Sequence, residues 1–129
     1  LNTMSKTILI LIFPLLFISF QPFEAPSKIE WQTETTHDFG NVKKGEPVGF
    51  DFVFKNIGET PITVDNVRVS CGCTAPEWDE AEVILPDSIG SVKLVFTSKT
   101  AGYFYKPAKV YFSGQRKPEK LFIEGDVVP

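Results

Sequence analysis

The segment at residues 48–55 constrains the fold most, because an apolar residue stands at every second position. Val48, Phe50, Phe52 and Phe54 alternate with Gly49, Asp51, Val53 and Lys55. Side chains of a β-strand point to opposite faces in turn, so the segment presents an aromatic face to a core and a mixed face outward. The pattern predicts a strand whose three phenylalanines are buried and whose Asp51 and Lys55 are exposed.

Other strand-forming segments follow one another without sustained helical periodicity. They lie at residues 29–36, 61–70, 92–96, 108–112 and 121–127, with glycine or proline in the turns between them. We interpret residues 56–59 as a hairpin turn and residues 74–90 as a long irregular link. Short strands at such spacings predict an all-β fold, an antiparallel sandwich of about seven strands.

The segment at residues 61–70 changes phase in its middle. Ile62 and Val64 share one parity, whereas Val67 and Val69 share the other. A β-bulge inserts one extra residue and reverses the facing of the residues after it. We therefore expect a bulge or bend at residues 65–66 that returns both apolar pairs to the core.

The N-terminal segment has the composition of a secretory signal. Lys6 precedes an almost unbroken apolar run at residues 8–20. A charged start followed by a short apolar run is typical of such signals, and the run is shorter than the roughly 20 residues of a spanning helix. We predict a signal peptide at residues 1–25 and one domain at residues 26–129, periplasmic or secreted. An uncleaved signal would instead anchor the domain to the membrane.

Composition favours a binding or structural role over catalysis. The 129 residues include 16 acidic and 13 basic side chains, a slightly acidic balance. Proteins that bind nucleic acids usually carry a basic face, so we expect no nucleic-acid partner. No complete catalytic set is recognisable, because His37 lacks an evident partner nucleophile. The sequence predicts a non-enzymatic protein without a cofactor, whose partner is another protein of the cell envelope.

Cys71-Gly72-Cys73 is the motif with the most chemical potential. In an oxidising compartment the two cysteines could form a disulfide, and Gly72 would give the backbone the freedom to close it. Two thiolates could instead hold a soft metal such as copper or zinc, with His37 as a further ligand. They could also be small buried apolar residues. We expect them at the end of a strand, on a corner, with their sulfurs close together.

Trp78 stands within an acidic run that contains Glu77, Asp79, Glu80 and Glu82. The run matches no calcium-binding loop and reads as a solvated surface segment. Trp78 is a candidate contact for a partner, and the alternative is that it packs over the cysteine corner.

The order of several short motifs resembles one known family. The motifs are Asp38-Phe39-Gly40-Asn41-Val42 with Gly45-Glu46, the aromatic strand with its Asn56-Ile57-Gly58 end, Ser70-Cys71-Gly72-Cys73-Thr74 with Pro76, Gly102-Tyr103-Phe104-Tyr105-Lys106, and Gly125-Asp126-Val127. In this order they resemble the bacterial domain of unknown function numbered fifteen seventy-three. One departure is visible, because Pro86-Asp87 stands where that family usually has Pro-Gly.

The resemblance implies an immunoglobulin-like fold related to Hydin-type and major-sperm-protein domains. Such relatives mostly bind other proteins, so the resemblance implies an interaction or structural module and no established reaction. The rival hypothesis is a redox or metal-binding function at the two cysteines.

Overall fold

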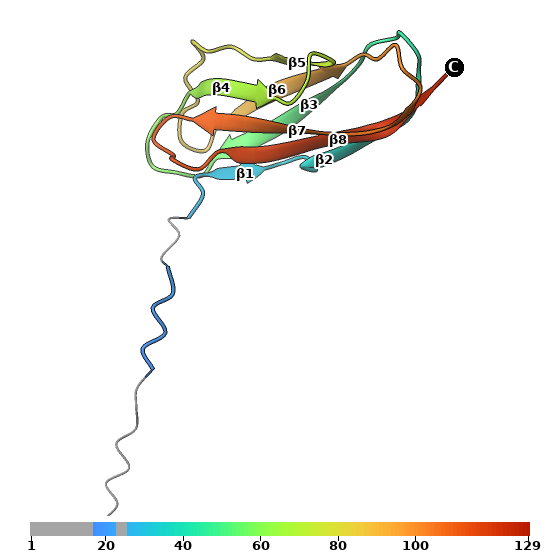
Figure 1. The fold of residues 1–129 in the computed structure, drawn as a ribbon. Helices are drawn as coiled ribbons and strands as arrows, with labels where there is room; N and C mark the ends of the chain where they lie inside the picture. Colours follow the sequence, from blue (N-terminus) through green and yellow to red (C-terminus); the bar gives the residue numbers. More distant parts are fainter. Residues whose placement is uncertain (1–16, 23–25) are drawn as a thin grey trace, which may run out of the picture.

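The domain is built from eight β-strands. The computed structural model describes residues 17–22 and 26–129, so most of the predicted signal segment at residues 1–25 lies outside it. The strands are β1 (Ile29–Trp31), β2 (Thr36–Lys43), β3 (Val48–Asn56), β4 (Val64–Val69), β5 (Thr74–Glu77), β6 (Ile89–Phe96), β7 (Gly102–Phe112) and β8 (Glu119–Val128) (Figure 1). Among the described residues there is no helix long and apolar enough to cross a membrane.

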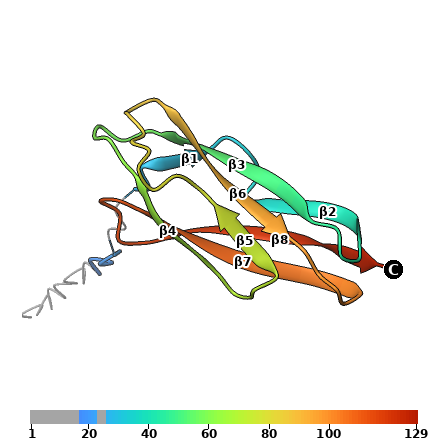
Figure 2. The ribbon, with the colours of Figure 1, turned by 90° about the horizontal axis from the view of Figure 1, so that it is seen from above.

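The strands form two four-stranded sheets packed face to face. The first sheet has the order β1-β3-β6-β5 and the second has the order β2-β8-β7-β4. Both sheets run along the long axis of the domain, with the C-terminus at the end opposite to the entry of the chain (Figure 1 and Figure 2). The predicted all-β, immunoglobulin-like sandwich is confirmed, with eight strands where about seven were expected.

One strand pair departs from the expected antiparallel arrangement. The chain passes from β1 in the first sheet directly to β2 at the edge of the second, without reversing. There β2 pairs parallel with β8, from Thr36 opposite Phe122 to Lys43 opposite Val128. A break in this register lies between Asp38 and Asn41. The second sheet is therefore mixed, and the N-terminal part of the domain is joined to its last strand.

The aromatic alternation of β3 forms the centre of the core. Phe52 and Phe54 are fully buried, as predicted, and Asp51 is exposed. Phe54 faces Gly90 of β6, where a Cβ atom would lie 2.5 Å from the phenylalanine Cζ atom. Only glycine leaves room for this ring to lie across the neighbouring strand.

The ends of the β3 pattern differ from the prediction. Phe50 is half-buried, because it lies towards the end of the sandwich and stacks on His37 with ring centroids 3.7 Å apart. Lys55 is also half-buried rather than exposed, since it lies between β1 and β6 in the sheet. Long side chains of this kind bury their stems along apolar surface while the charge stays in water.

The segment at residues 56–59 is not a hairpin turn, because β3 and β4 belong to different sheets. Asn56 is completely buried and holds the segment in which the chain crosses from the first sheet to the second. Its side-chain NH2 group donates to the carbonyl oxygens of Thr60 and Ile84, at 2.9 and 3.0 Å, and its side-chain oxygen accepts from Gly58 N–H. A buried polar side chain is stable only when it is paired in this way.

The expected bulge in the next strand is confirmed. The register of β4 against β7 shifts between Val64 and Asn66, and both Val64 and Val67 are buried. The following link is less irregular than predicted, because residues 74–77 form β5 at the edge of the first sheet. Pro76 fits there, since an edge strand needs hydrogen bonds on one side only.

Candidate functional site

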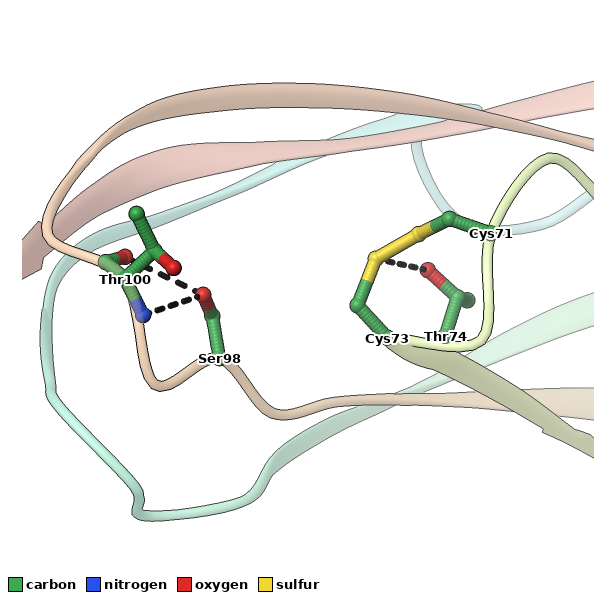
Figure 3. Close-up of a disulfide and its surroundings, with 5 residues drawn as sticks. All are labelled: Cys71, Cys73, Thr74, Ser98 and Thr100. Carbon is green, nitrogen blue, oxygen red and sulfur yellow. Dashed lines mark hydrogen bonds between the residues drawn. A yellow bond between two sulfur atoms is a disulfide. The ribbon is translucent and has the colours of Figure 1, made fainter.

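The two cysteines form a disulfide at the corner between β4 and β5. Their Cα atoms are 5.3 Å apart, and the single residue Gly72 separates them (Figure 3). Thr74 N–H donates to the carbonyl oxygen of Cys71 at 3.3 Å, and Thr97 N–H donates to that of Cys73 at 3.0 Å. The corner is therefore fixed to the end of β6, and both cysteines remain half-buried rather than enclosed.

The two sulfurs have different surroundings. Cys73 packs against the hydrophobic core, and its sulfur lies 3.9 Å from the hydroxyl oxygen of Thr74 (Figure 3). Cys73 also lines a pocket of about 210 Å³ together with Lys106. The remaining walls come mainly from residues 98–104, at the link between β6 and β7.

The link between β6 and β7 is held by one serine. The Ser98 hydroxyl accepts a hydrogen bond from Thr100 N–H and donates one to the carbonyl oxygen of Thr100, both at 3.1 Å (Figure 3). A local side-chain bond of this kind takes the place of a backbone turn bond. One wall of the pocket therefore has a defined shape.

The structure does not bring His37 to the cysteines. Its ring stacks on Phe50 and its Nδ1 lies 2.7 Å from a carboxylate oxygen of Glu34. In the described part of the chain no three His, Cys, Asp or Glu side chains are grouped as ligands for a metal ion. The geometry at Cys71 and Cys73 is that of a disulfide corner.

Trp78 lies against the body of the domain. It is half-buried, packs against the core, and donates its indole N–H to the carbonyl oxygen of Val64 at 3.2 Å. The acidic residues around it are exposed, and the Asp79 carboxylate accepts from Ala81 N–H at 2.9 Å. Trp78 thus holds the acidic loop against the bulge of β4.

An exposed aromatic surface, which the sequence reasoning missed, covers the outer side of the second sheet. Tyr103 and Tyr105 of β7 are 65% and 48% exposed, although they belong to a central strand. Phe122 of β8 stacks on Tyr105 with ring centroids 5.1 Å apart. We call Tyr103, Tyr105 and Phe122 the aromatic face.

The residue pattern of β7 already indicates the aromatic face. Residues 102–112 carry apolar side chains at both parities, and one parity belongs to the core through Ala108, Val110 and Phe112. The other parity contains all three tyrosines of the chain. A strand of a one-sided sheet normally carries polar residues on its second parity.

Charges of opposite sign accompany the aromatic face. Acidic residues lie beside its two tyrosines and basic residues lie beyond Phe122, because paired residues of neighbouring strands point to the same side. The acidic group is Asp38, Glu124 and Asp126, and the basic group is Arg68, Lys109 and Lys120. The Arg68 guanidinium lies over the ring of Tyr111, 5.5 Å from its centre.

Tyr103 is bonded to the acidic group. Its hydroxyl donates to a Glu124 carboxylate oxygen at 2.7 Å. This hydrogen bond, together with some desolvation and nearby negative charge, raises the pKa of Tyr103 from 10.0 to about 12. Tyr103 therefore stays a neutral hydrogen-bond donor at physiological pH.

The fold is shared with solved structures of low sequence identity. PapD-like domain 7 of human CEP192 matches with a TM-score of 0.65 and 12% identity, over 84% of this chain and 92% of that one. A protein of unknown function from Porphyromonas gingivalis W83 matches with a TM-score of 0.63 and 13% identity, over 77% of this chain and 46% of that one. The VesB protease of Vibrio cholerae matches with a TM-score of 0.64 and 13% identity, over 78% of this chain and 32% of that one. Such likeness shows the fold alone.

This chain spans less than half the length of each of these two bacterial proteins. No curated protein matches it in sequence. Residues 29–127 match the model of a family described as "Protein of unknown function (DUF1573)". That match covers all eight strands except the last residue of β8. The resemblance inferred from the motifs is thereby confirmed: the chain belongs to the DUF1573 family.

Proposed function

We propose that the protein is an exported, non-enzymatic interaction module that binds another protein of the cell envelope through the aromatic face. The observation that carries this proposal is the exposure of Tyr103 and Tyr105 on a central strand. Protein interfaces are enriched in tyrosine and other aromatic residues, which combine a large apolar area with a polar tip.

The charges around the aromatic face define the chemistry of the partner. Acidic residues lie beside Tyr103 and Tyr105, and basic residues lie on the same sheet beyond Phe122. A complementary partner carries apolar groups beside a basic patch, with an acidic patch farther along. Such an arrangement fixes the orientation of the partner and speeds its encounter, more than it raises affinity.

Two features support export. The sequence begins with a segment of secretory type. Cys71 and Cys73 are joined in a disulfide, and disulfides persist in oxidising compartments such as the periplasm or the cell exterior.

Site-specific photocrosslinking tests the docking surface. A photoreactive phenylalanine analogue replaces Tyr105 in the protein expressed in its own cells, and crosslinked products are identified by mass spectrometry. We expect one dominant envelope protein. The yield of the crosslinked product should fall when the salt concentration is raised from about 0.05 to about 0.5 M, because salt screens the attraction between the charged residues of the two proteins.

Asp51 provides the matched control position. It is exposed on the outer side of the first sheet, away from the aromatic face. The analogue at position 51 should not capture the same protein. Equal capture from both positions, or no product from position 105, would contradict the proposed surface.

A second comparison separates specific docking from non-specific hydrophobic binding. Tyr105 and Ile89 are 48% and 52% exposed, and they lie in different sheets. Tyr105→Ser should reduce binding of the captured partner at least tenfold, whereas Ile89→Ser should leave it unchanged. A hot-spot aromatic at an interface centre commonly contributes about 2 kcal/mol or more, roughly a factor of 30.

A further inference from the structure

The disulfide corner has features that a purely structural bond does not need. The bond closes a loop that contains only Gly72. In the chain-entropy model, stabilisation by a disulfide increases with the length of the loop that it closes, so this bond contributes little to the stability of the domain. Both cysteines also remain half-buried, and a reactant can therefore reach the corner.

Lys106 lies where the β-strand pattern calls for an apolar residue. It belongs to the inward parity of β7, between the buried residues Phe104 and Ala108, and it pairs with Ile123 of β8. Removing a charged side chain from water costs free energy unless the charge is paired. Lys106 is half-buried and lines the pocket that also contains Cys73.

The environment favours a negative charge on one sulfur over the other. Cys73 has the Thr74 hydroxyl beside its sulfur, and Lys106 lines the same pocket. A hydrogen-bond donor and a nearby cation both stabilise a thiolate. Cys73 is therefore the better leaving group, and the sulfur of Cys71 is the one that an incoming thiolate attacks.

We propose that the Cys71–Cys73 disulfide is a thiol–disulfide exchange site that oxidises a pair of thiols on a partner protein. This activity is independent of docking at the aromatic face.

The exchange has two balanced steps. A partner thiolate attacks the Cys71 sulfur, a bond forms between the two, and the Cys71–Cys73 bond breaks with its electron pair leaving on Cys73. The partner's second thiolate then attacks the partner sulfur of this mixed disulfide, which forms the partner's disulfide and releases Cys71 as a thiolate. Two electrons pass from the partner to the cysteine pair. The two protons of the partner's thiols end on Cys71 and Cys73.

A synthetic peptide with two reduced cysteines tests the reaction on the purified protein. Samples are quenched with iodoacetamide, which alkylates every free thiol, and the intact masses of protein and peptide are measured. We expect the protein to gain two carbamidomethyl groups, one on each released thiol, and the oxidised peptide to take up none, with the near-ultraviolet circular dichroism of the folded domain unchanged. Reduction that occurs only after this signal is lost would show a structural bond and overturn the proposal.

Reduced glutathione, a single thiol, tests which sulfur is attacked. Without a second thiol the mixed disulfide persists long enough to be located by fragment mass spectrometry. The proposal requires glutathione on Cys71. Predominant attachment to Cys73 would overturn the proposed asymmetry and the proposal with it.

Lys106→Gln and Lys93→Gln form a matched pair. Both remove one positive charge from a half-buried lysine of a central strand, but Lys93 lies on the outer side of the first sheet, opposite Asp51 and Glu77. Lys106→Gln should slow the reaction with glutathione about threefold, the effect of a leaving thiol whose pKa is higher by about one unit. Lys93→Gln should react at the wild-type rate. Equal rates for the two variants would overturn the role of the pocket and, with it, the proposal.

Discussion

Individual buried side chains of β3 stabilise this small sandwich in different ways. Phe52 has no exposed surface, and its ring meets those of Trp31 and Phe50 edge to face at 6.5 and 4.8 Å. Asn56 is equally buried, but it contributes through hydrogen bonds to the carbonyl groups of Thr60 and Ile84, which lie outside the named strands. Phe52 lies in the middle of β3 and Asn56 is its last residue, so one strand combines aromatic packing with polar pairing.

Phe52→Ala should cost about 3–5 kcal/mol of unfolding free energy, because it removes a fully buried ring and leaves a cavity. Domains of this size have about 5–15 kcal/mol in total. Urea unfolding of the variant measures the loss. Phe50→Ala is the control, and its half-buried ring should cost only about 1–2 kcal/mol. An unchanged midpoint for Phe52→Ala would show that the strand register is wrong.

The phenol of Tyr103 should make stability depend on alkaline pH. Its pKa is raised to about 12 by the hydrogen bond to Glu124, so the folded state holds this proton more tightly than the unfolded state. The stabilisation is complete below the unfolded pKa of 10.0 and is lost as the pH rises through about 12.

Ultraviolet absorbance of tyrosinate during a pH titration measures this ionisation. Tyr103→Phe should remove the step near pH 12, and Glu124→Gln should move it towards its ordinary position. A wild-type titration that is complete by about pH 11, a full unit below the raised pKa, would contradict the Tyr103–Glu124 contact.

Among the elements, the connections depart most from what the sequence pattern predicted. The alternation of residues 48–55 and the phase change at residues 65–66 follow from local rules, so both were predictable. The crossing at Asn56 and the parallel pairing of β2 with β8 depend on which sheet a segment joins. Local periodicity cannot decide between sheets, because each offers the same apolar interior to an incoming strand.

The link before β6 contains a strained residue. Asp87 has a φ of +66°, in the left-handed region, and its N–H donates to the carbonyl oxygen of Asn56 at 2.7 Å. The motif pattern that the sequence resembles has glycine at this position, and glycine takes this conformation without a steric penalty. The departure from the family pattern is therefore accommodated by backbone strain, and the turn keeps its shape.

Asp87→Gly should raise the unfolding free energy by up to about 1 kcal/mol, because it relieves this strain. Thermal unfolding followed by circular dichroism measures the change. Glu80→Gly is the control, since Glu80 is exposed in a neighbouring loop and has no positive φ. It should lower stability slightly through the greater freedom of the unfolded chain. A decrease for Asp87→Gly as large as that of the control would contradict the strain.

For the whole molecule, the class of fold was accessible from the sequence and the functional surfaces only in part. The cysteine corner was predicted from the end of the apolar pairing and from Gly72. The aromatic face was missed because Tyr103 and Tyr105 read as ordinary strand residues until the register of β7 showed which side they face.

The mass of the protein recovered from its cells tests export. We expect a chain that lacks a segment ending between residues 19 and 25, found outside the cytoplasm. It should be lighter by about two hydrogen masses than its reduced form, the difference made by one disulfide. Full-length protein recovered with cytoplasmic markers and two alkylatable thiols would contradict the proposal of export.

The pairing of β2 with β8 has a consequence for the timing of folding. Thr36 pairs with Phe122, and Phe122 N–H donates to the carbonyl oxygen of Thr35, so the beginning of the domain needs a partner from its end. Contacts so distant in sequence form late, because closing a long loop costs entropy before any contact compensates it. The second sheet cannot be completed until the last ten residues of strand, Glu119–Val128, have left the ribosome. Until β8 emerges the domain stays incompletely folded, and an incompletely folded chain is what the proposed export through a narrow translocation channel requires.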